Sequence, residues 1–133
     1  MKYIGIDYGL KRIGISISNE DGTVAFPHQV LENNSAWLNT LVLLSEKTLA
    51  NGGFVFGESR DLSMTENPLM KDIHAMIVSL KEASDLSIHL HPEYMTSREA
   101  NRFIEEDEMH DARAAALILQ HFLDSKNKQK TQE

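Results

Sequence analysis

The first 31 residues show the apolar, β-branched pattern of three consecutive strands. The segments Lys2–Asp7, Arg12–Ser18 and Thr23–Leu31 are rich in isoleucine, valine and aromatic residues, which are enriched in strands. A glycine-containing turn at residues 8–11 joins the first two segments, and a D-G turn at residues 19–22 joins the second to the third. The pattern predicts an antiparallel meander of three strands.

Beyond residue 34 the apolar positions recur with helical spacing, and two more strands follow. The spacing predicts a helix from Ser35 to an Asn-Gly-Gly stop signal, then a short buried strand at Phe54–Phe56 and a polar loop at Gly57–Thr65. A second helix begins at Pro68, and a fifth strand follows at Leu86–His91. Because a helix separates strands four and five, we expect these two strands to be parallel.

Two further helices complete the predicted fold. A T-x-x-E capping box at Thr96–Glu99 predicts a short helix at Ser97–Glu105, and the Ala- and Leu-rich segment Asp111–Leu123 predicts the last helix. The polar residues 125–133 have nothing apolar to bury, so we expect a flexible tail after a single domain of residues 1–124. The predicted class is α/β: a mixed five-stranded sheet, with three antiparallel strands plus two parallel strands, flanked by helices.

Composition narrows the class of protein. The 133 residues are 41% hydrophobic and 25% charged, which is the balance of a folded globular domain. Cysteine is absent, so a metal would have to be held by Asp, Glu, His or backbone oxygen. No apolar run is long enough for a membrane span, so we expect a cytoplasmic protein without a membrane partner. The net charge of -7 argues against a DNA-coating role but is compatible with an enzyme that has a local basic rim.

Three carboxylates stand at the ends of predicted elements. Asp7 ends the first strand, with Gly9 beside it and Gly14 opposite, Glu93 follows the fifth strand, and Asp111 lies in the first turn of the last helix. Taken singly, a turn cap, a loop charge and compensation of the helix dipole are the simpler explanations. Taken together, the three acids can converge on one site, where hard oxygen ligands favour Mg²⁺ or Mn²⁺. A pair of such ions suits hydrolysis of a phosphodiester.

Three segments resemble a known family. They are Ile6–Gly14 (IDYGLKRIG), Glu93–Ala100 (EYMTSREA) and Asp111–Gln120 (DARAAALILQ), and in order and spacing they resemble the YqgF/RuvX family. The resemblance implies an RNase H-like fold. It also implies one of the two activities described for the family, Holliday junction resolution or maturation of the end of small-subunit ribosomal RNA. The implied partner is therefore an RNA precursor or branched DNA, and we expect a monomer or a weak homodimer.

The resemblance also implies roles for individual residues. The acidic triad of the family falls on Asp7, Glu93 and Asp111, which would be the catalytic residues and the ligands of Mg²⁺ or Mn²⁺. Lys11 and Arg12 match the basic pair after the glycine turn and would contact a phosphate of the nucleic acid. The three acids of the triad are the same residues that the sequence places at the ends of predicted elements.

The chain departs from the family pattern at two places. Where the family has an acid before the glutamate and an arginine after it, this chain has Pro92 and Tyr94. The Gly-Leu-Pro-Leu stretch of the family is replaced here by residues 57–63 (GESRDLS). Arg60, within that stretch, is the candidate to supply the missing positive charge toward nucleic acid.

Two other classes of protein are alternatives to a nuclease. Asp7 and Gly9 with the later Gly14 also look like the first phosphate loop of the actin, Hsp70 and sugar-kinase ATPases, but those enzymes enclose the nucleotide with a second large domain that 133 residues cannot provide. The Pro92 and Tyr94 departures and the acidic charge favour instead a non-catalytic RNA- or ribosome-associated module. A pure binding protein, however, gains nothing from clustered like charges that repel without a cation. The predicted function is therefore a metal-dependent nuclease that hydrolyses phosphodiester bonds.

Overall fold

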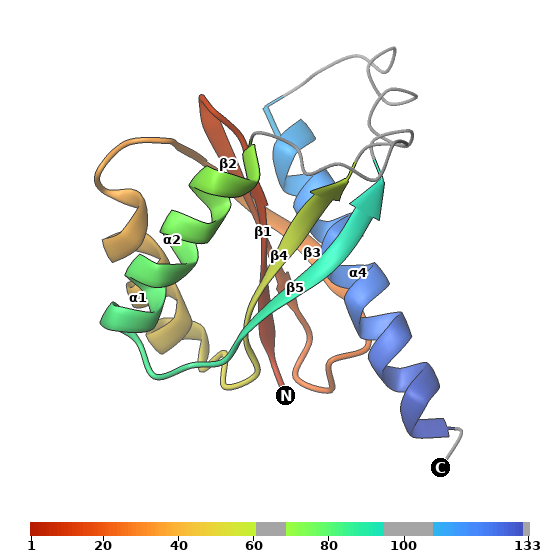
Figure 1. The fold of residues 1–133 in the computed structure, drawn as a ribbon. Helices are drawn as coiled ribbons and strands as arrows, with labels where there is room; N and C mark the ends of the chain where they lie inside the picture. Colours follow the sequence, from red (N-terminus) through yellow and green to blue (C-terminus); the bar gives the residue numbers. More distant parts are fainter. Residues whose placement is uncertain (61–68, 95–107, 132–133) are drawn as a thin grey trace.

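A five-stranded sheet with helices on both faces forms the body of the protein (Figure 1). The computed structural model describes residues 1–60, 69–94 and 108–131. Within them lie the strands β1 (Tyr3–Tyr8), β2 (Arg12–Ser18), β3 (Ala25–Glu32), β4 (Gly53–Arg60) and β5 (Ile88–Tyr94), and the helices α1 (Trp37–Thr48), α2 (Leu69–Ala83) and α4 (His110–Thr131). The order of strands in the sheet is β3-β2-β1-β4-β5.

The strand directions confirm the predicted mixed sheet. β1 pairs antiparallel with β2, and β2 pairs antiparallel with β3. β1 and β4 are parallel, and so are β4 and β5. Consequently the carboxyl ends of β1, β4 and β5 lie at the same end of the sheet, together with the turn from β1 to β2.

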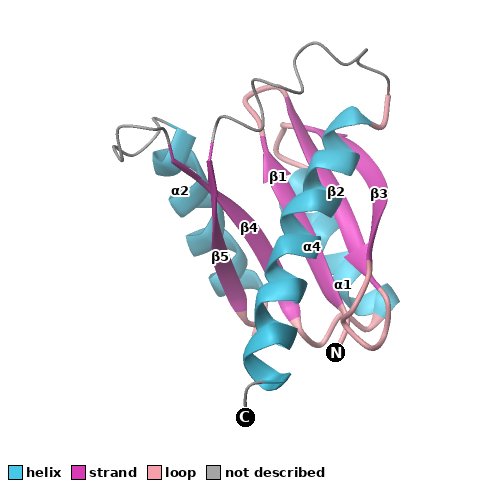
Figure 2. Cartoon of the chain, turned by 90° about the vertical axis from the view of Figure 1, so that its right-hand side faces the viewer, coloured by secondary structure: helices cyan, strands magenta, loops and turns pink. Residues whose placement is uncertain are grey.

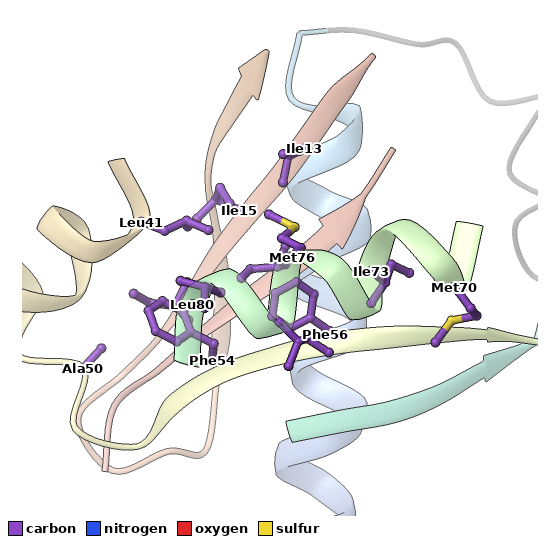
Figure 3. Packing of buried hydrophobic residues seen from close by; sticks show 13 residues of the cluster. Ile13, Ile15, Leu41, Ala50, Phe54, Phe56, Met70, Ile73, Met76 and Leu80 are labelled. Atoms are coloured by element: carbon purple, nitrogen blue, oxygen red, sulfur yellow. The ribbon is translucent and has the colours of Figure 1, made fainter. Parts of the chain in front are cut away.

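Each face of the sheet buries its own apolar core. Helices α1 and α2 cover one face, and Met76 and Leu80 of α2 belong to one buried cluster with Phe54 and Phe56 of β4 (Figure 3). Helix α4 runs across the other face (Figure 2). The core beneath α4 comprises Tyr3, Val55, Ile118, Leu119 and Leu123. Successive residues of β1 therefore serve different cores, because side chains alternate along a strand.

The predicted boundaries of two strands differ from the structure. Residues 57–60, predicted as part of a polar loop, continue β4 because they pair with β5 from Gly57 opposite His91 to Arg60 opposite Tyr94. For the same reason β5 extends to Tyr94 and includes Glu93, which the sequence analysis places beyond the strand. Hydrogen bonds between the parallel strands β4 and β5 therefore keep residues 57–60 in strand conformation, although these residues show no apolar strand pattern.

The carboxyl-terminal residues also differ from the prediction. Residues 125–131, predicted as part of a flexible tail, form about two further turns of α4. The Nζ of Lys126 donates to the hydroxyl of Tyr3 and lies 4.8 Å from the centroid of its ring. In addition, Nδ2 of Asn127 donates to the carbonyl of Gly22 at 3.1 Å. Polar contacts and a cation–π contact therefore dock this last part of α4, where apolar burial is lacking.

Some predicted features lie outside the residues that the structure describes. These are the helix at Ser97–Glu105 and the helix start at Pro68. Among the described helices, none is long and apolar enough to cross a membrane.

Candidate active site

Asp7 lies near the carboxyl end of β1, on the face of the sheet that α4 covers. Its neighbours Ile6 and Tyr8 pack into the core under α1 and α2, so the alternation of the strand turns Asp7 to the opposite face. Only 9% of Asp7 is exposed, and its partner across the ladder is Gly14 of β2. Burial of a carboxylate is costly unless the group is hydrogen-bonded, paired or bound to a metal.

Gly14 allows the first turn of α4 to lie directly on the sheet beside Asp7. A Cβ atom at residue 14 would overlap the carbonyl group of Asp111 and would lie 3.0 Å from the backbone nitrogen of Ala112. Residues that face each other across an antiparallel ladder project on the same side of the sheet, so Asp7 projects on the side where this turn lies. Because residue 14 is a glycine, the backbone of Asp111 can lie against β2 beside Asp7.

Arg12 holds Asp111 in the first turn of α4. Its Nε donates to Oδ2 of Asp111 at 2.9 Å. The side chains are 58% and 27% exposed, respectively, and an exposed pair of this kind contributes at most about 1 kcal/mol to stability. The guanidinium predicted to contact phosphate thus contacts a candidate metal ligand.

Asn33 fixes the turn that carries Lys11. The backbone N–H of Asn33 donates to the carbonyl of Lys11, and its side-chain Nδ2 donates to the carbonyl of Gly9, each at 2.9 Å. Lys11 itself is exposed, as a residue that contacts phosphate must be. Arg60 ends β4 opposite Tyr94, and the side chain of Arg60 lies outside the described residues.

Glu93 is directed away from the two aspartates. It stands opposite Ser59 in the ladder of β4 and β5, and its Oε1 lies 2.8 Å from Nδ1 of His121 on α4. An ionised carboxylate only accepts hydrogen bonds, so the ring nitrogen is the donor. His121 comes ten residues after Asp111 in α4, which is about 15 Å farther along the helix axis. The contact with His121 therefore directs Glu93 to the middle of α4 and not to its first turn.

The three acidic residues have the oxygen ligands that a hard divalent cation prefers. Their positions in the structure do not bring all three carboxylates together. Carboxylate oxygens are the ligands that Mg²⁺ and Mn²⁺ prefer, and the backbones of Asp7 and Asp111 both lie beside Gly14. Glu93 does not fit as it is placed. Within residues 1–60, 69–94 and 108–131, no three His, Asp or Glu side chains lie close enough together to hold one ion. The structure thus brings the backbones of Asp7 and Asp111 to the same part of the sheet, whereas the carboxylate of Glu93 contacts His121.

His121 is the residue of this region that the sequence does not single out. It is separated from Glu93 by 28 positions, and no motif links the two. One weak signal exists, an ionisable residue between the apolar positions Leu119 and Leu123 of a helix. Whether that residue faces β5 depends on how α4 crosses the sheet, which the sequence pattern does not specify.

Solved structures with the same fold place the protein in a structural class. RuvC from Thermus thermophilus in complex with a Holliday junction substrate matches with a TM-score of 0.55 and 16% identity, covering 95% of this chain and 96% of that chain. A second structure of Thermus thermophilus RuvC matches with a TM-score of 0.58 and 13% identity, covering 96% and 97%. At these identities the likeness shows the fold, which is RNase H-like as predicted.

Sequence similarity then identifies the family. Residues 1–125 match RuvX, described as Holliday junction resolvase. A "Putative pre-16S rRNA nuclease" of Nitratidesulfovibrio vulgaris is 30% identical, covering 98% of this chain and 99% of that protein. A protein of the same name from Rickettsia bellii is 33% identical, with coverage of 94% and 87%. The chain belongs to the RuvX family.

Proposed function

We propose that this protein is a nuclease that hydrolyses phosphodiester bonds with the help of Mg²⁺ or Mn²⁺. The observation that carries the proposal is that Asp7 and the backbone of Asp111 both lie beside Gly14, on the same face of the sheet, in a member of the RuvX family. Two carboxylates brought together in a partly buried place repel each other unless positive charge compensates them. A divalent cation held by Asp7 and Asp111 would compensate this charge, and it would supply activation of water and stabilisation of the charge that develops at phosphorus.

In this proposal, different residues bind the cation, contact the phosphate of the substrate and orient the metal ligands. Asp7 and Asp111 hold the cation, and Glu93 completes the set of acidic groups. Lys11, in the turn that Asn33 fixes, contacts a phosphate of the substrate. Arg12 orients Asp111 through Nε, and its terminal NH₂ groups are the part of a guanidinium that grips phosphate oxygens.

Arg60 is the third phosphate contact of the proposal. It stands at the end of β4, at the same end of the sheet as the carboxyl end of β1. A cation there offsets the absence of an arginine at residue 94, where this chain has tyrosine.

The names of the most similar relatives support an RNA precursor as the substrate, whereas the family that matches residues 1–125 is described as Holliday junction resolvase. The relatives named for pre-16S rRNA are 30% and 33% identical over more than nine-tenths of this chain. The likeness to RuvC, one structure of which contains a Holliday junction, rests on the fold at 16% identity. We therefore propose pre-16S rRNA as the substrate and a four-way DNA junction as the alternative.

A non-catalytic RNA-binding module is the second candidate function. The observation that favours it is the pairing of Asp111 with Arg12 and of Glu93 with His121. Because the guanidinium of Arg12 already compensates Asp111, charge balance alone does not require a cation there.

A cleavage assay separates these candidates. The purified chain is incubated with a 16S rRNA precursor that keeps its 5′ extension, with the same RNA lacking the extension, and with a four-way DNA junction. Each reaction contains Mg²⁺, Mn²⁺ or EDTA. We expect cleavage of the extended RNA in Mg²⁺ or Mn²⁺ and none in EDTA. Cleavage of the junction alone would assign the DNA substrate, and RNA binding without cleavage in either metal would assign the non-catalytic module.

A further inference from the structure

The turn between β1 and β2 presents an apolar side chain to solvent. Leu10 is 70% exposed, and it belongs to neither of the two apolar cores. The next two residues of the turn, Lys11 and Arg12, have exposed side chains as well. The turn lies at the end of the sheet where β1 reaches Asp7. An apolar group next to two cations is therefore exposed beside the candidate active site.

Contacts with Asn33 hold this turn in one conformation. The Nδ2 of Asn33 donates to the carbonyl of Gly9, and the backbone N–H of Asn33 donates to the carbonyl of Lys11. Gly9 and Lys11 are the residues on either side of Leu10. The turn is also tight, because a Cβ atom at residue 9 would lie 2.6 Å from the carbonyl oxygen of Arg12. Movement of the turn that buried Leu10 against a core would have to break these hydrogen bonds.

An ordered apolar side chain next to cations matches one part of a nucleic acid. Lysine and arginine bind the phosphates, and the faces of the nucleobases are the apolar surface that lies beside them. In a duplex these faces are covered by stacking, whereas an unpaired segment presents them. A side chain whose backbone is already fixed loses less conformational entropy when it binds. The turn therefore fits an unpaired strand better than a duplex.

We propose that Leu10 packs against a nucleobase in an unpaired segment of the RNA while Lys11 contacts a flanking phosphate. This inference rests on the proposed function of the protein as an RNA nuclease, and it adds the kind of RNA that the site binds. A leucine makes no hydrogen bond with its side chain, so the contact does not depend on which base is present. A leucine that was merely exposed would have no effect on RNA binding.

Equilibrium binding to two RNA probes tests the proposal. The probes are an oligouridylate, which is unpaired, and a duplex of the same oligouridylate with oligoadenylate. Affinities of the wild type, L10A and L43A are measured at several salt concentrations in EDTA, which prevents metal-dependent cleavage. Leu43 lies on α1 and is 58% exposed, so L43A controls for the loss of an exposed leucine far from the turn. Thermal unfolding shows that each variant is folded.

The loss in L10A is expected to be confined to the unpaired probe. L10A should bind oligouridylate about three- to tenfold more weakly, the range expected for partial burial of a leucine side chain. The slope of log affinity against log salt should not change, because no phosphate contact is lost. L10A should bind the duplex within about twofold of the wild type, and L43A should match the wild type on both probes.

Other outcomes would overturn the inference in distinguishable ways. Wild-type affinity of L10A for oligouridylate, an equal loss on the duplex, or an equal loss in L43A would refute the contact of Leu10 with a base. A change in the sedimentation of L10A without RNA would assign Leu10 to a contact between two copies of the chain and would also refute it. Cleavage of the extended RNA by a wild type that does not bind oligouridylate would refute the inference and leave the nuclease intact. A wild type that neither binds nor cleaves RNA would refute the proposed function, and the inference would fail with it.

Discussion

Gly14→Ala tests the contact that brings the start of α4 to Asp7. The added methyl group would overlap the carbonyl of Asp111, and no flexible side chain is available there to move aside. The first turn of α4 would have to move away from β2 by about 1.5 Å before the contact becomes a normal one. Asp111 moves with that turn, whereas Asp7 belongs to the sheet.

The expected effects of Gly14→Ala follow from this displacement. Overpacking of a tight contact costs about 1 to 3 kcal/mol of unfolding free energy. A displacement of about 1 Å between groups that act together can lower activity by about 100-fold. We therefore expect a moderate loss of stability and a much larger proportional loss of cleavage.

Gly57→Ala is the matched control. Gly57 also lies beneath α4, but a Cβ atom there would meet the end of the Ile118 side chain, with Cδ1 at 2.7 Å. A flexible side chain can move aside, so the cost should stay below about 1 kcal/mol and cleavage should stay within a few-fold of the wild type. Urea unfolding and RNA cleavage are measured for both variants. Wild-type stability and cleavage in Gly14→Ala would refute the placement of α4 against β2.

Three further substitutions test individual contacts. Lys11→Ala should reduce the slope of log affinity against log salt for RNA by about one, because one phosphate contact is lost, and an unchanged slope would exclude Lys11 from the interface. Arg12→Ala should weaken RNA binding but lower the unfolding free energy by no more than about 1 kcal/mol. A loss of several kcal/mol in urea would instead assign a structural role to its pair with Asp111. Lys126→Ala should cost about 0.5 to 1 kcal/mol through its contact with Tyr3, and no change in urea unfolding would contradict docking of the end of α4.

Local signals explain why much of the fold could be predicted from the sequence. The two turns of the meander and the alternation in its strands are short-range features, and they specify that Gly14 faces Asp7, as the ladder confirms. The helix between the last two strands requires a crossover, which the parallel pairing of β4 and β5 confirms.

The features that the sequence did not reveal depend on contacts between distant residues. Residues 57–60 are polar and join β4 only because β5 pairs with them. Arg12 and Asp111 are 99 positions apart, so their pairing depends on where α4 begins on the sheet. The partner of Glu93 likewise depends on the angle at which α4 crosses β5. The acids could be named from their positions at element ends, but the directions of their side chains could not.

Asp7→Asn separates a metal ligand from a residue that merely caps the turn at residues 8–11. Asparagine caps a turn almost as well as aspartate, and removal of one of several neighbouring negative charges does not destabilise the metal-free fold. Cleavage of the extended RNA by Asp7→Asn is measured at saturating Mn²⁺, beside its unfolding in urea. We predict that cleavage is abolished while the unfolding free energy is unchanged or higher. Cleavage by Asp7→Asn at the wild-type rate would contradict the role of Asp7 as a metal ligand and would favour the non-catalytic module.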